Sequence, residues 1–207
     1  MTVKRLKYLP QRHWTPRYLK DRVLESQYRH THPGEPWLTS TAIGLLSTWL
    51  RPSDNALEFG SGRSTAWFAA RVGSLVSVEH NPAWHARVTP LVTKLGVDYR
   101  LRPDRDGYVG VAREFASSSL DFVLVDGEYR DSCVLAATDL VKPGGLLVVD
   151  NANWFIRGPK TGSPWTLAYT SDRWEQFTGQ VADWRLMWTT NGVWDTALYF
   201  RPCNKCE

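Results

Sequence analysis

The feature that most limits the fold is a strand–turn–helix–strand pattern in the first half of the chain. A buried strand ends at Phe59, a turn carries Gly60 and Gly62, and a second strand ends at Glu79. Glycine has no Cβ, so the turn can be tight and a ligand can approach its backbone. The helix after the turn begins with unpaired N–H groups, and Glu79, about 17 residues after Gly62, can accept hydrogen bonds from a ribose. The pattern predicts a βαβ unit that binds a nucleoside.

The same alternation of strand and helix continues along the chain. Strands are expected at 56–59, 75–79, 97–101, 120–125, 146–149, 184–188 and 194–200. Helices are expected at 17–28, from Thr39 or Ser40 to 50, and at 64–72, 82–95, 111–116, 131–140 and 171–178, with a loop at 103–110 and a turn at 142–145. Asn191-Gly192 is a hairpin signal between the last two strands. The expected fold is α/β: a doubly wound, mostly parallel, seven-stranded Rossmann-like sheet with an antiparallel C-terminal hairpin.

Two positions distinguish the turn from a dinucleotide fingerprint. Thr65 stands where that fingerprint has its third glycine, and the acid Glu58 precedes the first glycine by two residues. A carboxylate there suits a ligand with an ammonium group better than a pyrophosphate. The segment resembles motif I of the class I S-adenosylmethionine (SAM)-dependent methyltransferases, E/D-x-G-x-G-x-G, with Ser64 in place of the last glycine. The resemblance implies that Glu79 binds the ribose of SAM and that His80 lies either near the adenine or in a surface turn. The full set of implied SAM-binding residues is Glu58, Gly60, Ser61, Gly62, Ser64, Thr65, Glu79, His80 and Asp126.

Polar side chains also follow the fourth and fifth expected strands. Asp126 comes directly after the fourth strand, and Asp150 and Asn151 follow the fifth. In an open parallel sheet these ends meet at the ligand edge, and such oxygen ligands suit Mg²⁺ or another divalent cation. The set resembles that of cation-dependent small-molecule O-methyltransferases of the catechol type. That resemblance implies that the three residues bind a metal, which activates the acceptor hydroxyl. The alternative is that Asp126 orients SAM or substrate while Asp150 and Asn151 cap a loop.

The general base is less well defined by the sequence. Tyr129 stands where catechol-type enzymes have lysine and related enzymes have histidine, and a phenol is a weak base at its ordinary pKa of about 10. Asp126, Asp150 and Tyr129 are therefore the catalytic candidates, with His80 as an alternative base in the absence of metal. Trp37, Trp154 and Arg157 are expected to line the substrate site.

Composition bounds the remaining interpretations. The chain has 207 residues, enough for one domain, and two parts are expected: a basic, aromatic arm at 1–36 and the methyltransferase domain at 37–207. The arm has eight Lys or Arg against three acids, a net charge of +5. The rest of the chain is therefore near −1, because the whole chain has a net charge of +4. It could contact an anionic substrate or nucleic acid, but we expect it to pack on the domain or on a second copy in a homodimer. No apolar run approaches the length of a membrane span, and three cysteines without a paired framework indicate a reducing cytoplasm.

The sequence thus predicts a SAM-dependent methyltransferase that modifies a hydroxyl group of a small molecule, with a divalent cation as a further candidate cofactor. Nucleic acid is not the expected substrate, because residues 38–207 contain no N-P-P-Y-type motif and no long basic stripe. The alternatives are a nicotinamide-dependent oxidoreductase of Rossmann type and a non-catalytic binding module with the same fold.

Overall fold

The computed structural model describes residues 15–203; residues 1–14 of the predicted arm and residues 204–207 of the predicted domain lie outside this range. Seven strands form one sheet in the order β3-β2-β1-β4-β5-β7-β6. The strands are β1 (Asn55–Phe59), β2 (Ser74–Glu79), β3 (Asp98–Leu101), β4 (Leu120–Val125), β5 (Val141–Asp150), β6 (Arg185–Thr190) and β7 (Asp195–Phe200). The first five are parallel, and β7 pairs antiparallel with both β5 and β6. The predicted fold is confirmed.

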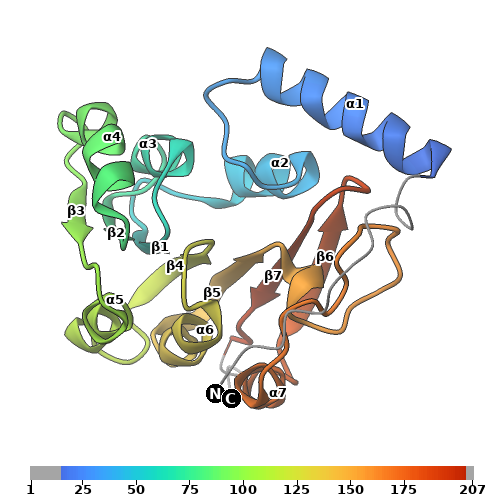
Figure 1. Ribbon diagram of the computed structural model, residues 1–207. Helices are drawn as coiled ribbons and strands as arrows, with labels where there is room; N and C mark the ends of the chain where they lie inside the picture. Colours follow the sequence, from blue (N-terminus) through green and yellow to red (C-terminus); the bar gives the residue numbers. More distant parts are fainter. Residues whose placement is uncertain (1–14, 204–207) are drawn as a thin grey trace.

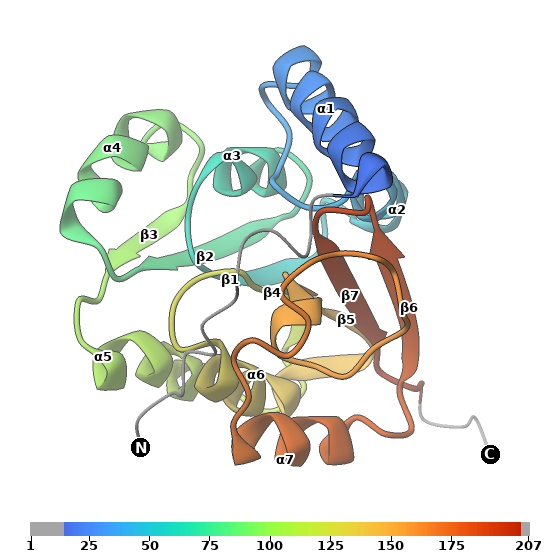
Figure 2. The same cartoon turned by 45° about the vertical axis from the view of Figure 1, so that its right-hand side comes forward.

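Helices cover both faces of the sheet, as Figures 1 and 2 show. One face carries α1 (Pro16–Thr31), α2 (Ser40–Trp49), α3 (Arg63–Ala69) and α4 (Pro82–Val92), and the other α5 (Arg105–Gly110), α6 (Arg130–Thr138) and α7 (Asp172–Gln180). Short 3₁₀ turns, η2 (Val111–Glu114) and η3 (Ala152–Trp154), follow α5 and β5. Helix starts are set by local sequence: the Thr39 hydroxyl accepts from Ala42 N, and Asn81 Oδ1 accepts from Ala83 N, with Pro82 at the first helical position.

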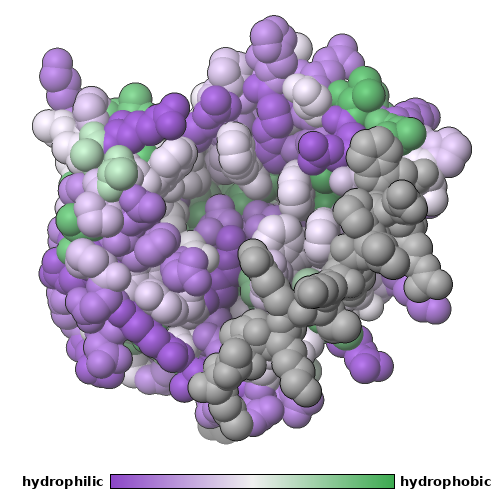
Figure 3. All heavy atoms as spheres, in the orientation of Figure 1, coloured by the Kyte–Doolittle hydropathy of each residue, from purple (hydrophilic) through white to green (hydrophobic). Residues whose placement is uncertain are grey.

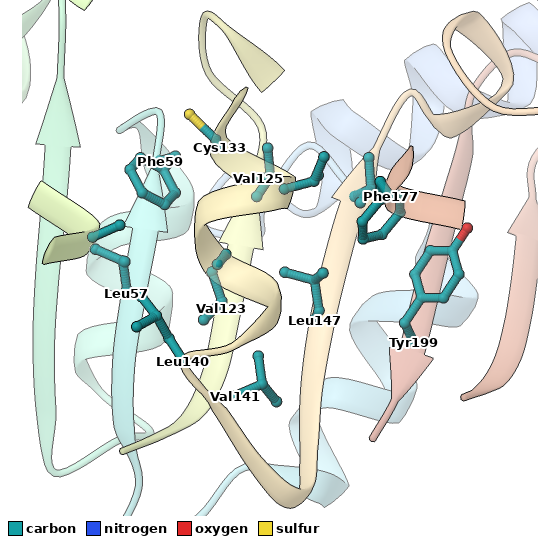
Figure 4. Packing of buried hydrophobic residues seen from close by; sticks show 14 of the residues in the cluster. Leu57, Phe59, Val123, Val125, Cys133, Leu140, Val141, Leu147, Phe177 and Tyr199 are labelled. Carbon is teal, nitrogen blue, oxygen red and sulfur yellow. The ribbon is translucent and has the colours of Figure 1, made fainter. Parts of the chain in front are cut away.

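The central strands are buried on both faces, and alternate residues serve two separate cores. Leu57, Phe59, Val123 and Val125 point to the α5–α6–α7 side, where Cys133 and Phe177 also pack (Figure 4). Phe122 and Leu124 point to the opposite side, against α2 and α3. This two-sided burial explains why the strands read as continuous apolar runs.

Two expectations about local structure were wrong. The predicted loop at 103–110 contains α5, because Asp104 caps a helix by accepting a hydrogen bond from Gly107 N at 2.7 Å. The predicted turn at 142–145 lies inside β5, where the β4 register passes from Leu120↔Val141 to Phe122↔Leu146. The strand therefore bulges at Gly144, which has a φ of +80°, and does not begin after it.

Helix α1 lies against the β6–β7 turn. Glu25 is buried, pairs with Arg29 and accepts from Asn191 Nδ2 at 2.7 Å, while Arg29 also donates to the Leu38 carbonyl at 2.7 Å. The outer side of α1 exposes Leu19, Val23 and Leu24, and a hydrophobic area is visible at the α1 end of Figure 3. The predicted domain division and homodimer stay predictions.

No helix within residues 15–203 is long and apolar enough to cross a membrane. The cytoplasmic location stays a prediction.

Candidate functional site

The glycine turn joins β1 to α3 at the carboxyl edge of the sheet. Gly60 has a φ of +99°, and a Cβ built there would lie 2.5 Å from both Cα and N of Gly127. A side chain at residue 60 would therefore collide with the turn after β4. The two turns are also joined by a hydrogen bond from Asp126 N to Phe59 O at 2.9 Å. The contact places Asp126 beside the predicted SAM turn.

Glu58 lies beneath this turn and is completely buried. Its Oε2 accepts hydrogen bonds from the hydroxyls of Thr65 and Ser77, each at 2.6 Å. Its Oε1 is buried and has no hydrogen-bond partner among residues 15–203. Burial raises the pKa of the Glu58 carboxyl to about 7, against the lowering effect of the surrounding hydroxyls. An unpartnered acceptor of this kind fits a ligand with a positively charged end, as SAM has.

Thr65 explains why this turn departs from the dinucleotide pattern. Its Oγ1 accepts from Gly62 N at 3.0 Å and donates to Glu58. Thr65 is fully buried and Ser64 nearly so. Thr65 therefore shapes the turn from inside, and the direct cofactor contact predicted for it stays a prediction.

Glu79 ends β2 and faces the glycine turn. Its Oε2 accepts from the Ser61 hydroxyl at 2.9 Å and from Ser61 N at 3.3 Å, and its Oε1 accepts from the backbone N–H of His80 and Asn81. Tyr99 also contacts that hydroxyl, at 2.7 Å. The carboxylate is thus held in place for the predicted role.

An aromatic group lies between the turns after β2 and β4. The ring of Tyr108, in α5, packs edge-on against His80 and Tyr129, with centroids 6.0 and 5.9 Å apart. The Tyr108 hydroxyl is buried without a hydrogen-bond partner in the described chain. Tyr129 begins α6 in the left-handed conformation, with a φ of +51°. Tyr108 could not be singled out from the sequence, because residues 103–110 are expected there to form a loop.

The three predicted metal ligands come together, but around an arginine. The guanidinium of Arg130 donates to Asp126 Oδ1 at 2.8 Å and to Asn151 Oδ1 at 3.3 Å. It also donates to the Asp150 carbonyl. The Asp150 side chain points elsewhere, with Oδ1 accepting from Thr196 Oγ1 at 2.7 Å. The sequence analysis did not single out Arg130.

The two carboxylates differ in access. The Asp126 side chain is 24% exposed, whereas Asp150 is 2% exposed. Burial raises the pKa of Asp126, and Arg130 opposes that shift. Burial and the nearby Asp126 charge raise the pKa of Asp150 to about 8. Arg130 therefore favours the charged form of Asp126, while burial disfavours a charge on Asp150.

These residues do not fit a divalent cation as they stand. A cation would have to displace the Arg130 guanidinium from two of the predicted oxygen ligands and would be repelled by it. In addition, residues 15–203 contain no group of three or more His, Cys, Asp or Glu side chains that could hold a metal ion.

The predicted substrate-lining residues are dispersed. Arg157 lines a pocket of about 470 Å³ together with Phe155 and Trp174, between the segment after β5 and α7. Trp154 packs against Phe155 and Tyr169, with ring centroids 6.2 and 5.8 Å apart. Trp37 is 62% exposed and lies under the Arg63 guanidinium. A substrate-lining role stays a prediction for all three.

The comparison with protein families matches residues 57–152 to a methyltransferase domain. This segment extends from β1 past Asn151 and includes the glycine turn, Glu79 and Asp126. The resemblance to class I SAM-dependent methyltransferases is confirmed. The domain match and the antiparallel terminal pair favour a methyltransferase over the nicotinamide-dependent alternative. No curated protein matches the chain significantly.

Solved structures share the methyltransferase fold at low sequence identity. A Corynebacterium glutamicum protein has a TM-score of 0.59 at 14% identity, covering 93% of each chain. An rRNA methylase from Streptococcus thermophilus has a TM-score of 0.53 at 10% identity, covering 78% of this chain and 95% of its own. A candidate methyltransferase from Streptococcus mutans, solved with S-adenosylhomocysteine (SAH), has a TM-score of 0.53 at 8% identity, covering 80% and 98%.

Proposed function

We propose that this methyltransferase transfers the methyl group of SAM to a hydroxyl group of a small molecule, and that Asp126 takes up the hydroxyl proton. The observation that carries the proposal is the contact between the two turns, which places Asp126 directly beside the glycine turn. A base must lie within hydrogen-bond reach of the hydroxyl that it deprotonates. Asp126 is the carboxylate of the pair that is open to a substrate.

The residues of the chain have separate tasks in this reaction. SAM, when bound, supplies a methyl group on a sulfonium. Glu58 and the glycine turn hold its charged end, and Glu79 holds the ribose. As the acceptor oxygen forms its bond to the methyl carbon, the carbon–sulfur bond breaks, the electron pair stays on sulfur and the proton passes to Asp126. The products are the methyl ether and SAH.

The size of the neighbouring pocket supports a small acceptor. The pocket beside Phe155 has a volume of about 470 Å³, within the range of small-molecule sites. The Arg130 guanidinium lies 5.4 Å from the centroid of the Phe155 ring, so the pocket adjoins the Asp126 region. Phe155 and Trp174 offer flat apolar surface, which suits an aromatic or amphipathic alcohol.

The first test is calorimetric titration with SAH and with NAD, followed by methyl transfer from labelled SAM to a panel of phenols, catechols and sugars. We expect SAH to bind, NAD not to bind, and label to appear on oxygen. Asp126→Asn should reduce turnover by about 10²- to 10⁴-fold while SAH affinity stays within about tenfold.

The matched control is Asp121→Asn, on the same strand at the opposite edge of the sheet. Asp121 pairs with Lys142 there, at 2.7 Å. This variant should leave turnover unchanged. Label found only on nitrogen, on carbon or on RNA would contradict the proposal, and the RNA outcome would align the chain with its rRNA methylase neighbour.

A further inference from the structure

The Arg130 side chain closes the carboxyl ends of β4 and β5. A guanidinium has five N–H donors, and all five have an acceptor here. Nε donates to Gly127 O at 2.9 Å, and Nη2 donates to Asp126 O at 2.7 Å and Oδ1 at 2.8 Å. Nη1 donates to Asp150 O and to Asn151 Oδ1. One side chain therefore joins the turns that follow two neighbouring strands.

The Arg130 guanidinium places a permanent positive charge between these strand ends. Arginine does not lose its proton in proteins, so the guanidinium is charged at every working pH. Its side chain is only 12% exposed and lies against the Phe155 ring. In this partly buried setting its hydrogen bond to Oδ1 of the Asp126 carboxylate is charge-assisted, and together with the bond to the Asp126 carbonyl it restricts the orientation of that group.

We propose that Arg130 is the resident cation of the acceptor site: it positions Asp126, ties it to the turn after β5, and makes a divalent metal unnecessary. The proposal rests on the proposed function in one respect, that Asp126 is the group that meets the acceptor. One side-chain oxygen of each predicted ligand is already bonded within the protein: Oδ1 of Asp126 and of Asn151 to Arg130, and Oδ1 of Asp150 to Thr196. Arg130 acts through Asp126 and is a positioning residue.

The first experiment measures metal binding directly, with the full chain. Mn²⁺ is titrated into the protein, with and without SAH, and free Mn²⁺ is followed by electron paramagnetic resonance. We expect no Mn²⁺ bound below about 1 mM, where metal-dependent sites would saturate. One Mn²⁺ per chain, lost in Asp126→Asn, would overturn the proposal. This readout does not require an acceptor, and a failure to bind SAH would count against the proposed function alone.

The second experiment uses Arg130→Ala, with SAH affinity measured beside turnover. We expect kcat to fall at least about tenfold while KM for SAM and SAH affinity change less than about threefold. Added guanidinium or ethylguanidinium should restore part of kcat, and Mg²⁺ should not. Restoration by Mg²⁺ and not by guanidinium would show that a metal belongs in the site.

Arg173→Gln is the matched control, because Arg173 is an exposed arginine on α7 that pairs with Asp131 at 3.6 Å. It should change neither kcat nor SAH affinity. Arg130→Lys keeps the charge with three donors and should fall between wild type and Arg130→Ala. If Arg130→Ala does not fold, Arg130→Lys decides the matter: an unchanged kcat in this variant would refute a positioning role that depends on the five-donor geometry.

Discussion

Replacing Glu58 by glutamine tests whether the carboxyl under the glycine turn is protonated in the ligand-free protein. The folded protein raises its pKa from 4.5 to about 7, mainly through burial. Below pH 4.5 the group is protonated in both the folded and the unfolded chain, so it does not affect stability. As the pH rises towards 7 the unfolded chain loses this proton while the folded chain keeps it, and stability falls. Above pH 7 the loss is constant.

The size of the effect follows from the shift. A rise of the pKa from 4.5 to about 7 corresponds to about 3 kcal/mol of unfolding free energy. About 1 kcal/mol of this is already lost at pH 5, so wild type should lose about 2–3 kcal/mol between pH 5 and pH 8. Glutamine does not titrate. The free energy of unfolding of the variant, relative to that of wild type, should therefore rise by that amount between pH 5 and pH 8. Its NH₂ group, placed where Oε1 has no partner, subtracts about 1–3 kcal/mol at every pH.

The assay is urea denaturation of the ligand-free wild type and variant at pH 5, 6, 7 and 8. Asp195→Asn is the control, since Asp195 is a fully buried carboxylate that accepts from Thr161, Ser163 and Trp188. It should lose stability at pH 8, by about 2–4 kcal/mol, because charge-assisted bonds are weakened. The reasoning would be refuted if the difference in free energy of unfolding between Glu58→Gln and wild type varied by less than about 0.5 kcal/mol from pH 5 to pH 8.

Three further predictions concern the same turn. If the ionised Glu58 receives the ammonium of the ligand, wild-type SAH affinity measured by calorimetry should fall about fivefold from pH 7 to pH 6, and Glu58→Gln should show no such fall. Gly60→Ala should cost about 2 kcal/mol or more in urea denaturation, because of its positive φ and contact with the next turn, whereas Gly44→Ala, with open space around it on α2, should gain about 0.5–1 kcal/mol. Thr65→Val should lower the free energy of unfolding by about 1–3 kcal/mol, because it loses the hydrogen bonds of its buried hydroxyl to Gly62 N and Glu58. The exposed Thr93→Val should stay within about 0.5 kcal/mol of wild type. Equal losses would contradict a role of Thr65 in holding the turn.

Most of the fold was predictable because its signals are local. The apolar run at β4 matched its observed bounds, Thr39 was one of the two residues expected to begin α2, and Asn191-Gly192 marked the hairpin correctly. The wrong predictions arose where strand pairing overrode a local signal. Gly144 reads as a turn residue, yet pairing with β4 continues on both sides of it, so the chain makes a bulge.

The candidate site was predictable only in part. The residues at the strand ends were found because parallel strands bring their carboxyl ends to one edge. The sequence did not reveal which side chain joins these strand ends, since Arg130 is the first residue of a helix and resembles any helical surface arginine in the sequence. Its bonds to Asp150 and Asn151 join positions about 20 residues apart.

By itself the sequence determined the βαβ order, the glycine turn and the identity of the acids around it, because these depend on short-range backbone preferences and on the two-sided burial of parallel strands. Only the tertiary structure decided the chemical state of those acids. It left Glu58 Oε1 without a partner, closed Asp150 from solvent, and surrounded the predicted metal position with the donors of Arg130. Burial and charge pairing depend on atoms that are close in space and distant along the chain, and no local pattern records them.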